Sequence, residues 1–218
     1  MTESVVSERA RRLMIWAAFA ACLSTALGGS SFVAIRFLVG QTDPVTVAFL
    51  RNGIAALILL PLALLYTRSW PTPRDALTIG LLGAIFFGGF QFMVSLALTY
   101  TTSARAALAL TTTPFLTMAV AAMLRVEAPS LRKVAGVALA SAGVAIALWR
   151  TADAPPQALI GDAIVIAAAL VGAFYAVLSA RYTRLYPPIT VVAIGVVPGA
   201  LFLWLAAILS GAAHVTAD

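Results

Sequence analysis

The long apolar runs of this chain contain few polar side chains, and these offer mainly hydrogen bonds and one internal positive charge. Polar groups in apolar surroundings are costly, so they tend to face a cavity or a neighbouring helix. We therefore interpret them as side chains that line a cavity for a small solute or that bond one helix to the next. The candidates are Ser31, Arg51, Asn52, Gln91, Tyr100, Thr112 and Tyr175.

Three of these candidates have more than one interpretation. Arg51 follows Pro44 by about two helical turns. Its guanidinium either snorkels to the interface, meets a carboxylate, or faces a cavity that takes an anionic solute. The Gln91 amide would be unsatisfied in lipid, which leaves cavity lining or an interhelical hydrogen bond. Tyr100 is either an interfacial aromatic anchor or a cavity residue.

A proline and three threonines mark the middle of the run at 104–124. Pro114 has no N–H, so the carbonyl of Leu110 loses its helical partner. The hydroxyls of Thr111, Thr112 and Thr113 can bond to the freed backbone. We expect a kink here, which either shapes a central cavity or is purely structural.

Two further motifs consist of small residues. Gly28, Gly29, Ser30 and Ser31 allow close backbone approach and hydroxyl bonds one turn back, so this segment either lines a path or packs tightly. Later in the chain, small residues recur at spacings that put them on one helix face. This stripe, which we assign to packing within or between subunits, is Gly136, Ala140, Gly143 and Ala147.

Several classes of site are excluded by the residues present. The single Cys22 and the single His214 lie far apart in the sequence, so we expect no metal site and no intrachain disulfide. No nucleophile with a base nearby is evident, and no nucleotide-binding loop is present. We expect no enzyme activity and no cofactor. Any transport would have to be driven by an ion gradient or by the gradient of the solute itself.

Composition places the chain in a bilayer. Hydrophobic residues make up 62% of the 218 positions and charged residues 10%, and mean hydropathy is +1.01. The apolar runs are continuous rather than alternating, so they predict membrane-spanning helices rather than barrel strands. The runs predict an all-α integral membrane protein with seven transmembrane helices at about 14–39, 44–66, 75–98, 104–124, 131–149, 159–180 and 188–210.

The basic residues predict the orientation. Ten of the fourteen lie in the N-terminal tail or in the second, fourth and sixth connectors. Because connectors rich in arginine and lysine stay in the cytoplasm, we expect a multi-pass protein of the cell (inner or plasma) membrane with its N-terminus inside. The net charge of +6 reflects this topology and does not indicate a nucleic-acid partner.

A weak internal repeat has an offset of 143 residues and aligns Gly29 with Gly172, Phe32 with Tyr175, and Pro44 with Pro187. Five helices lie in the first unit, so a second copy enters the membrane inverted. We expect a cytoplasmic tail at 1–13, a first unit at 14–149, a connector at 150–158 and a partial second unit at 159–218. That second unit holds two of its five expected helices before the chain stops at Asp218.

These features resemble the EamA family of the drug/metabolite transporter superfamily. The resemblance runs from about Trp16 to near the end and is carried by GGSSFVAIRF, DPVTVAFLRNGIAALILLPLAL, the stretch from Ala97 to Leu148, and GDAIVIAAALVGAFYAVLSARY. It implies a ten-helix, inverted-repeat secondary carrier whose central cavity opens alternately to each side. The chain departs from the family by ending after its seventh helix, and by Val126-Glu127 where Gly-Glu is common.

Two hypotheses follow. The first is an exporter of amino acids, metabolites or drugs, with the lipid bilayer and a small solute as partners. Whether a coupling ion takes part, and whether the chain forms a homo- or hetero-oligomer, stays open. The second hypothesis is a truncated or accessory membrane protein that does not transport on its own and packs through the small-residue stripe.

Overall fold

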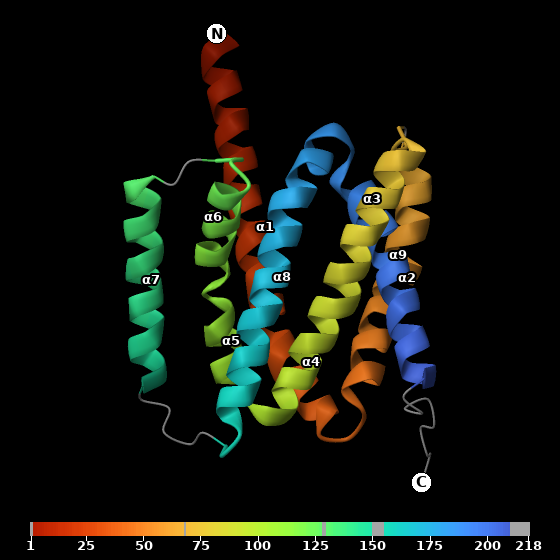
Figure 1. Cartoon of the computed structure of the whole chain (residues 1–218). Coiled ribbons are helices and arrows are strands. Elements are labelled where there is room, and N and C mark those ends of the chain that lie inside the picture. The colour runs from red at the N-terminus through yellow and green to blue at the C-terminus, as the bar shows by residue number, and fades with distance from the viewer. Residues whose placement is uncertain (1, 68, 128–129, 150–154, 210–218) are drawn as a thin grey trace.

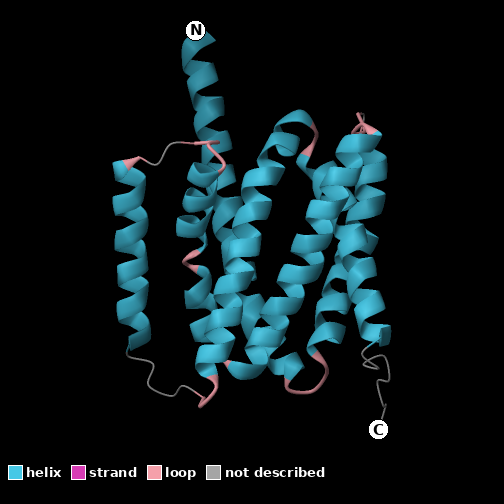
Figure 2. Cartoon of the chain, viewed as in Figure 1, coloured by secondary structure: helices cyan, strands magenta, loops and turns pink. Residues whose placement is uncertain are grey.

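The computed structural model describes residues 2–67, 69–127, 130–149 and 155–209. All elements in this part of the chain are helical and are joined by short loops (Figure 2). In order they are α1 (Thr2–Val39), α2 (Pro44–Tyr66), α3 (Pro73–Gly83), η1 (Ala84–Phe90), α4 (Gln91–Tyr100), α5 (Ser103–Leu110), α6 (Thr113–Met123), α7 (Leu131–Trp149), α8 (Ala158–Leu185) and α9 (Pro188–Leu209).

Six helical stretches are long and apolar enough to cross a membrane, and each corresponds to a predicted span. They are Met14–Val39, Pro44–Tyr66, Pro73–Tyr100, Ser103–Met123, Ala158–Leu185 and Pro188–Leu209. The third combines α3, η1 and α4, and the fourth combines α5 and α6. The remaining predicted span, 131–149, forms helix α7 but is not among the six. The seven-span layout and the inverted second unit therefore stay predictions.

Proline and capping side chains begin several of the helices. Asp43 precedes Pro44 and its Oδ1 accepts a hydrogen bond from the Val45 N–H at 3.1 Å. Thr102 does the same for α5, its hydroxyl oxygen accepting from the Arg105 N–H at 3.3 Å. Such caps satisfy N–H groups that have no partner within the helix. The connectors can therefore be short, which places consecutive helices side by side.

The connectors fall into two groups at opposite ends of the bundle (Figure 1). The connectors after α2, α6 and α8 lie at the end from which α1 starts, and we name this the basic end. Two hydrogen bonds tie α9 and the α8–α9 connector to earlier segments there. The Tyr186 hydroxyl donates to Asp75 Oδ2 at 2.7 Å, and the Thr67 and Thr190 hydroxyls lie 2.6 Å apart. The hydrogen bond to Asp75 raises the pKa of Tyr186.

At the opposite end, five helices share an apolar core. Ile35 of α1, Val47 of α2, Leu98 of α4, Ala106 of α5 and Val165 of α8 are all buried in it. Exposed large apolar side chains cover the outer faces instead, as with Leu57 at 77% and Leu159 at 78%. An apolar exterior of this kind suits contact with lipid. The chain is a multi-pass membrane protein with an apolar core near the end opposite the basic end.

A π-helical segment lies inside the third span. Its wider turns shift α4 in register relative to α3, and glycines on both sides bring it very close to α9. A Cβ built on Gly83 would lie 2.1 Å from the Cα of Gly195, and one on Gly199 would lie 2.6 Å from the Cβ of Phe87. Backbone therefore packs directly on backbone at this crossing.

The predicted domain boundaries are not resolved by the fold. Helix α1 already begins at Thr2, within the stretch predicted as a tail. Residues 150–154 of the predicted connector and residues 210–218 of the last unit lie outside the described residues. The repeat-related glycines have different surroundings, since Gly172 packs on Phe86 and Phe90 whereas a Cβ on Gly29 would meet nothing within 4 Å.

Replacing Gly83 should test the contact between α3 and α9. We expect Gly83→Ala to lower the free energy of unfolding by about 1–3 kcal/mol, because the added methyl overlaps the α9 backbone. The measurement is reversible unfolding in mixed detergent micelles. Gly136→Ala is the matched control, since a Cβ there meets nothing within 4 Å. Equal stability of the two variants would contradict this close contact.

Candidate functional site

A polar layer lies next to the apolar core on its side toward the basic end, between facing sides of α2 and α4. Arg51 Nη1 donates a hydrogen bond to Gln91 Oε1 at 3.3 Å. Arg51 follows the core residue Val47 by four residues, and Gln91 precedes the buried Val94 by three, so each lies one turn from the core on the same helix face. Of the two alternatives for Gln91, cavity lining or an interhelical hydrogen bond, the structure contains the bond, and its partner is Arg51.

The charge in this layer has no counter-charge. Within the described residues, the ion pairs are Arg105–Asp162 and Lys133–Glu127, and Arg51 takes part in neither. A charged side chain near the middle of a membrane helix costs about 2.5–3.5 kcal/mol on insertion scales. A neutral amide offsets part of this cost. The arrangement can present a guanidinium, held in position by Gln91, to whatever occupies the space beside α2 and α4.

The other predicted cavity residues are bonded within their own helices or lie apart from this layer. Asn52 is 2% exposed and its Nδ2 donates to the Ala48 carbonyl at 2.9 Å. Ser31 donates to the Gly28 carbonyl at 2.7 Å, as does Thr112 to Ala109 at 2.6 Å. Tyr100 is half-buried in the last turn of α4. The structure joins Arg51 with Gln91 and leaves the other candidates outside that pair.

At Pro114 the helix is interrupted rather than bent within one element. Helix α5 ends at Leu110 and α6 begins at Thr113, with Pro114 in its first turn. The Thr113 hydroxyl donates to the Leu110 carbonyl at 2.6 Å, which is the carbonyl that loses its partner to the proline. The threonine hydroxyl replaces the missing backbone donor, so the break leaves no unsatisfied carbonyl at Leu110.

Tyr175 belongs to an aromatic stack on the π-helical segment. Its ring lies 4.2 Å from that of Phe86 with an angle of 7° between the planes, and Phe86 stacks in turn on Phe90 at 4.9 Å. Gly172 packs against the same two phenylalanines. This stack joins α8 to η1 through aromatic contact, so the ring of Tyr175 has a packing role.

Sequence analysis missed a charged cluster at the end opposite the basic end. Asp162 of α8 accepts a hydrogen bond from the Thr101 hydroxyl at its Oδ1, at 2.8 Å. Its Oδ2 accepts from Arg105 Nε at 3.2 Å and also from Arg105 Nη2. The Arg105 and Asp162 side chains are 20% and 19% exposed. Gly161 permits the approach, because a Cβ there would lie 2.7 Å from Thr101 Cβ.

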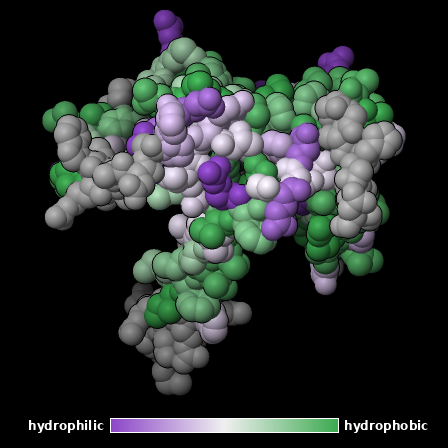
Figure 3. Space-filling view, turned by 90° about the horizontal axis from the view of Figure 1, so that it is seen from below, coloured by the Kyte–Doolittle hydropathy of each residue, from purple (hydrophilic) through white to green (hydrophobic). Residues whose placement is uncertain are grey.

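Arg36 supports the same end of the bundle. Its guanidinium donates to the Leu98 carbonyl, which lies in the last turn of α4, where carbonyls lack helical partners. A cation at a helix C-terminus is favoured by the helix dipole. Figure 3, seen from this end, shows hydrophilic side chains gathered in the middle of the face among apolar ones. The end is thus closed by charge and hydrogen bonds on the outer side of the apolar core.

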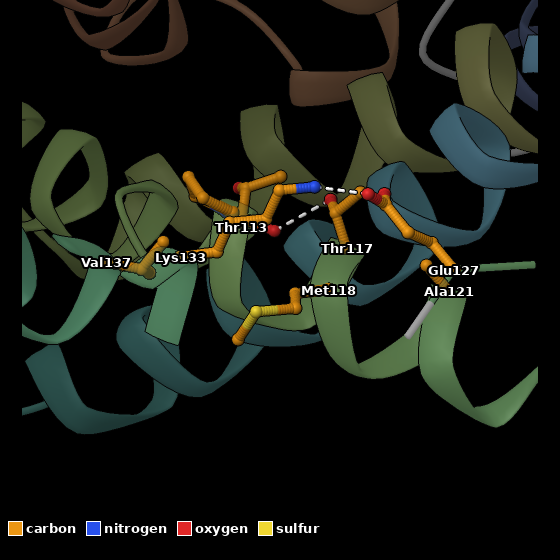
Figure 4. A pocket seen from close by; sticks show the side chains of 8 residues that line it. Thr113, Thr117, Met118, Ala121, Glu127, Lys133 and Val137 are labelled. Carbon is orange, nitrogen blue, oxygen red and sulfur yellow. Dashed lines mark hydrogen bonds and ion pairs between the residues drawn. The ribbon is translucent and has the colours of Figure 1, made fainter. Parts of the chain in front are cut away.

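A pocket of about 370 Å³ lies between α6 and α7 near the basic end. Lys133 and Glu127 point toward each other at its edge and form an ion pair (Figure 4). The hydrogen bond and charge of Lys133 lower the pKa of Glu127. The remaining lining residues are Thr113, Pro114, Thr117, Met118, Ala121 and Val137. Both charged side chains are more than half exposed, so this pair contributes little to stability.

The small-residue stripe of α7 faces outward where it is described. Gly136 and Gly143 are exposed, and a Cβ at either would meet nothing within 4 Å. The side chains of Ala140 and Ala147 lie outside the described residues. In the part of the chain that the structure describes, no group of three or more His, Cys, Asp or Glu residues could hold a metal ion.

The model of the EamA-like transporter family matches residues 15–149, which is more than half of the chain. The chain belongs to the EamA-like transporter family. The match includes the Arg51–Gln91 pair, Arg105 and Pro114, whereas Asp162 lies beyond it. The polar layer is therefore within the family region, and the ion pair joins that region to α8.

Two relatives extend the comparison of this EamA chain. It is 26% identical over 181 residues to an uncharacterized transporter, YyaM, of Bacillus subtilis (strain 168), covering 80% of this chain and 59% of that protein. It is 28% identical over 123 residues to a WAT1-related protein, At4g01440, of Arabidopsis thaliana, covering 54% and 33%. The chain therefore spans between about one third and three fifths of these relatives' lengths.

A solved crystal structure of a protein shares the fold. The TM-score is 0.61 at 23% identity, and the match covers 85% of this chain and 67% of that one. At this identity the likeness concerns the fold alone.

The Arg105–Asp162 pair should be energetically coupled. In a double-mutant cycle with Arg105→Gln and Asp162→Asn, we expect a coupling energy of about 1–3 kcal/mol, because the bonds are charge-assisted and mostly shielded from water. Unfolding in mixed micelles measures it. The matched control cycle, Lys133→Gln with Glu127→Gln, should give less than about 1 kcal/mol, since that pair is exposed. Coupling no larger than the control's would contradict a structural role for Asp162.

Proposed function

We propose that this chain forms part or all of a secondary carrier that exports small solutes, such as amino acids, other metabolites or drugs, across the cell membrane. Membership of the EamA-like transporter family and six helices able to cross a membrane support transport. The solute would use a central cavity that opens alternately to either side. Spans one to four with six and seven would line it, and an ion or solute gradient would supply the energy.

The observation that carries this proposal is the combination of a closed end and a polar layer on the inner side of its apolar core. The core, Arg36 and the Arg105–Asp162 pair close one end of the bundle, and the Arg51–Gln91 pair lies on the inner side of that core. The Arg105–Asp162 pair joins α5 to α8 at that end, and opening the end would let water hydrate both charges as they separate. Such a closure suits an end that opens and closes repeatedly.

Orientation and the repeat complete the proposal. The basic end would face the cytoplasm, because connectors rich in arginine and lysine stay inside. The closed end would then face outward. Residues 14–149 would form the first five-helix unit and residues 159–218 the start of an inverted second one. In a carrier of that design the two units rock against each other, and the Arg105–Asp162 pair would be a contact between them.

An accessory role without transport is the second candidate. It is favoured by α7, whose Gly136 and Gly143 leave an open small-residue face next to the exposed Leu139 and Ile146. Small residues at such spacing allow two helices to approach closely in a membrane. In this case the chain would act by packing on a second copy or on another membrane protein.

Transport can be tested by locking the closed end. In a Cys22→Ser background, Thr101→Cys and Asp162→Cys replace two hydrogen-bonded side chains at that end with two facing thiols. We expect proteoliposomes loaded with radiolabelled amino acids to lose label through this protein, oxidation of the two thiols to a disulfide to stop the flux, and reductant to restore it by cleaving that disulfide. The measurement is the initial rate of efflux.

The control for the cross-link is Leu77→Cys with Leu81→Cys, two exposed positions one turn apart on α3. Cross-linking within one helix should leave the flux unchanged. Flux that continues after the Thr101–Asp162 cross-link would contradict alternating access. An absence of flux from the uncross-linked protein, together with a stable oligomer that Gly136→Leu dissociates, would favour the accessory role.

A further inference from the structure

Arg51 lies seven residues inside the span Pro44–Tyr66, whereas the other arginines of the described spans lie within four residues of a span end, namely Arg36, Arg74, Arg105, Arg181 and Arg184. Arg36 caps the C-terminus of α4, and Arg105 pairs with Asp162. Arg181 stacks on the ring of Tyr182 at 4.5 Å, and Arg184 lies in the last turn of α8, where the helix dipole favours a cation. Arg51 has a hydrogen bond to a neutral amide instead. Within the described residues, Arg51 thus carries a positive charge well inside a span and has no ion-pair partner.

The side of α2 that carries Arg51 is directed away from an apolar groove between α2 and α9. Phe49, Gly53 and Leu60 line an apolar groove of about 520 Å³ against α9. Residues at these spacings share one helix face, and Arg51, two positions after Phe49, lies about 200° around the helix from it. Arg51 therefore lies on the side that meets α4, and not on the side that faces the groove.

Gln91 both positions the guanidinium and extends the donor set. Its Oε1 accepts from Arg51, which orients its Nε2, a group with two donor hydrogens. A guanidinium has five N–H donors in a planar fork, and here one of them contacts Gln91. The Arg51 side chain is exposed although it lies on an inner side of α2, so its other N–H donors are accessible. The pair thus offers several convergent donors and one positive charge.

We infer that Arg51 and Gln91 form a binding site for the carboxylate of the transported solute, an inference that rests on the proposed transport function. A carboxylate matches the planar fork and supplies the missing negative charge. One guanidinium balances a monoanion and leaves half of a phosphate dianion uncompensated. The site therefore favours organic acids or amino acids over phosphorylated solutes and over neutral ones.

The test measures binding apart from transport. Purified full-length chain in detergent is titrated with benzoate, propionate and L-leucine, with the amide of each, and with inorganic phosphate at constant ionic strength. The readout is the change in melting temperature. We expect at least one carboxylate to stabilise the protein at concentrations roughly tenfold lower than its amide or phosphate. No preference for any carboxylate over its amide would overturn the inference.

Variants assign the effect to the pair. Gln91→Glu keeps Arg51 but places a carboxylate beside it, so carboxylate stabilisation should be lost although the protein folds. Arg51→Lys should weaken it roughly tenfold because a lysine lacks the planar fork, and Arg51→Gln should abolish it. Arg74→Gln, an exposed position at the basic end, should leave it unchanged. If Arg51→Gln does not fold, the Gln91→Glu result decides. Carboxylate stabilisation that survives in Gln91→Glu would overturn the inference.

Failure of the site and failure of transport give different results. If proteoliposomes export carboxylates and their amides equally well and Arg51→Gln has no effect, transport stands and the carboxylate site is wrong. If the carboxylate preference and its loss in Gln91→Glu are observed but no solute moves, the site stands and the proposed function is wrong.

Discussion

The contact of Asp162 with Arg105 and Thr101 fixes how the start of α8 meets the earlier spans. It ties the start of α8 to the loop between α4 and α5, and Gly161 allows the two backbones to approach. An unpaired carboxylate or guanidinium in this place would carry the full cost of lost hydration. Pairing makes the position of α8 relative to α5 specific, and the apolar core of Ile35, Val47 and Leu98 forms beside it.

That closure explains where the remaining polar groups can lie. With one end filled by the core and its charged cluster, Arg51 and Gln91 form the next layer toward the basic end. The π-helical segment immediately before Gln91 shifts α4 in register, and π-helical turns often occur at functional sites. The same segment packs on α9 through Gly83 and Gly195. The carboxylate site that we infer is therefore held by the tightest helix contacts in the described chain.

Local patterns predicted the spans well because each depends on its own composition. Six of the predicted spans are present with small shifts at their ends, and the role of Pro114 follows from the absence of its N–H. Contacts between distant residues were harder to predict. The pairing of Arg105 with Asp162 joins positions 57 residues apart, and neither periodicity nor charge counts specify such a partner. The contact of Gly83 with Gly195 requires a crossing point that only the assembled helices define.

A distance measurement across the closed end tests the central claim that the Asp162 contact holds that end together. Spin labels at Thr99→Cys and Leu159→Cys in a Cys22→Ser background report the separation of α4 and α8 by pulsed electron spin resonance. Adding Asp162→Asn should lengthen and broaden this distance distribution, while labels at Leu77 and Leu185 report the basic end. An unchanged Thr99–Leu159 distribution in a folded Asp162→Asn protein would contradict the account.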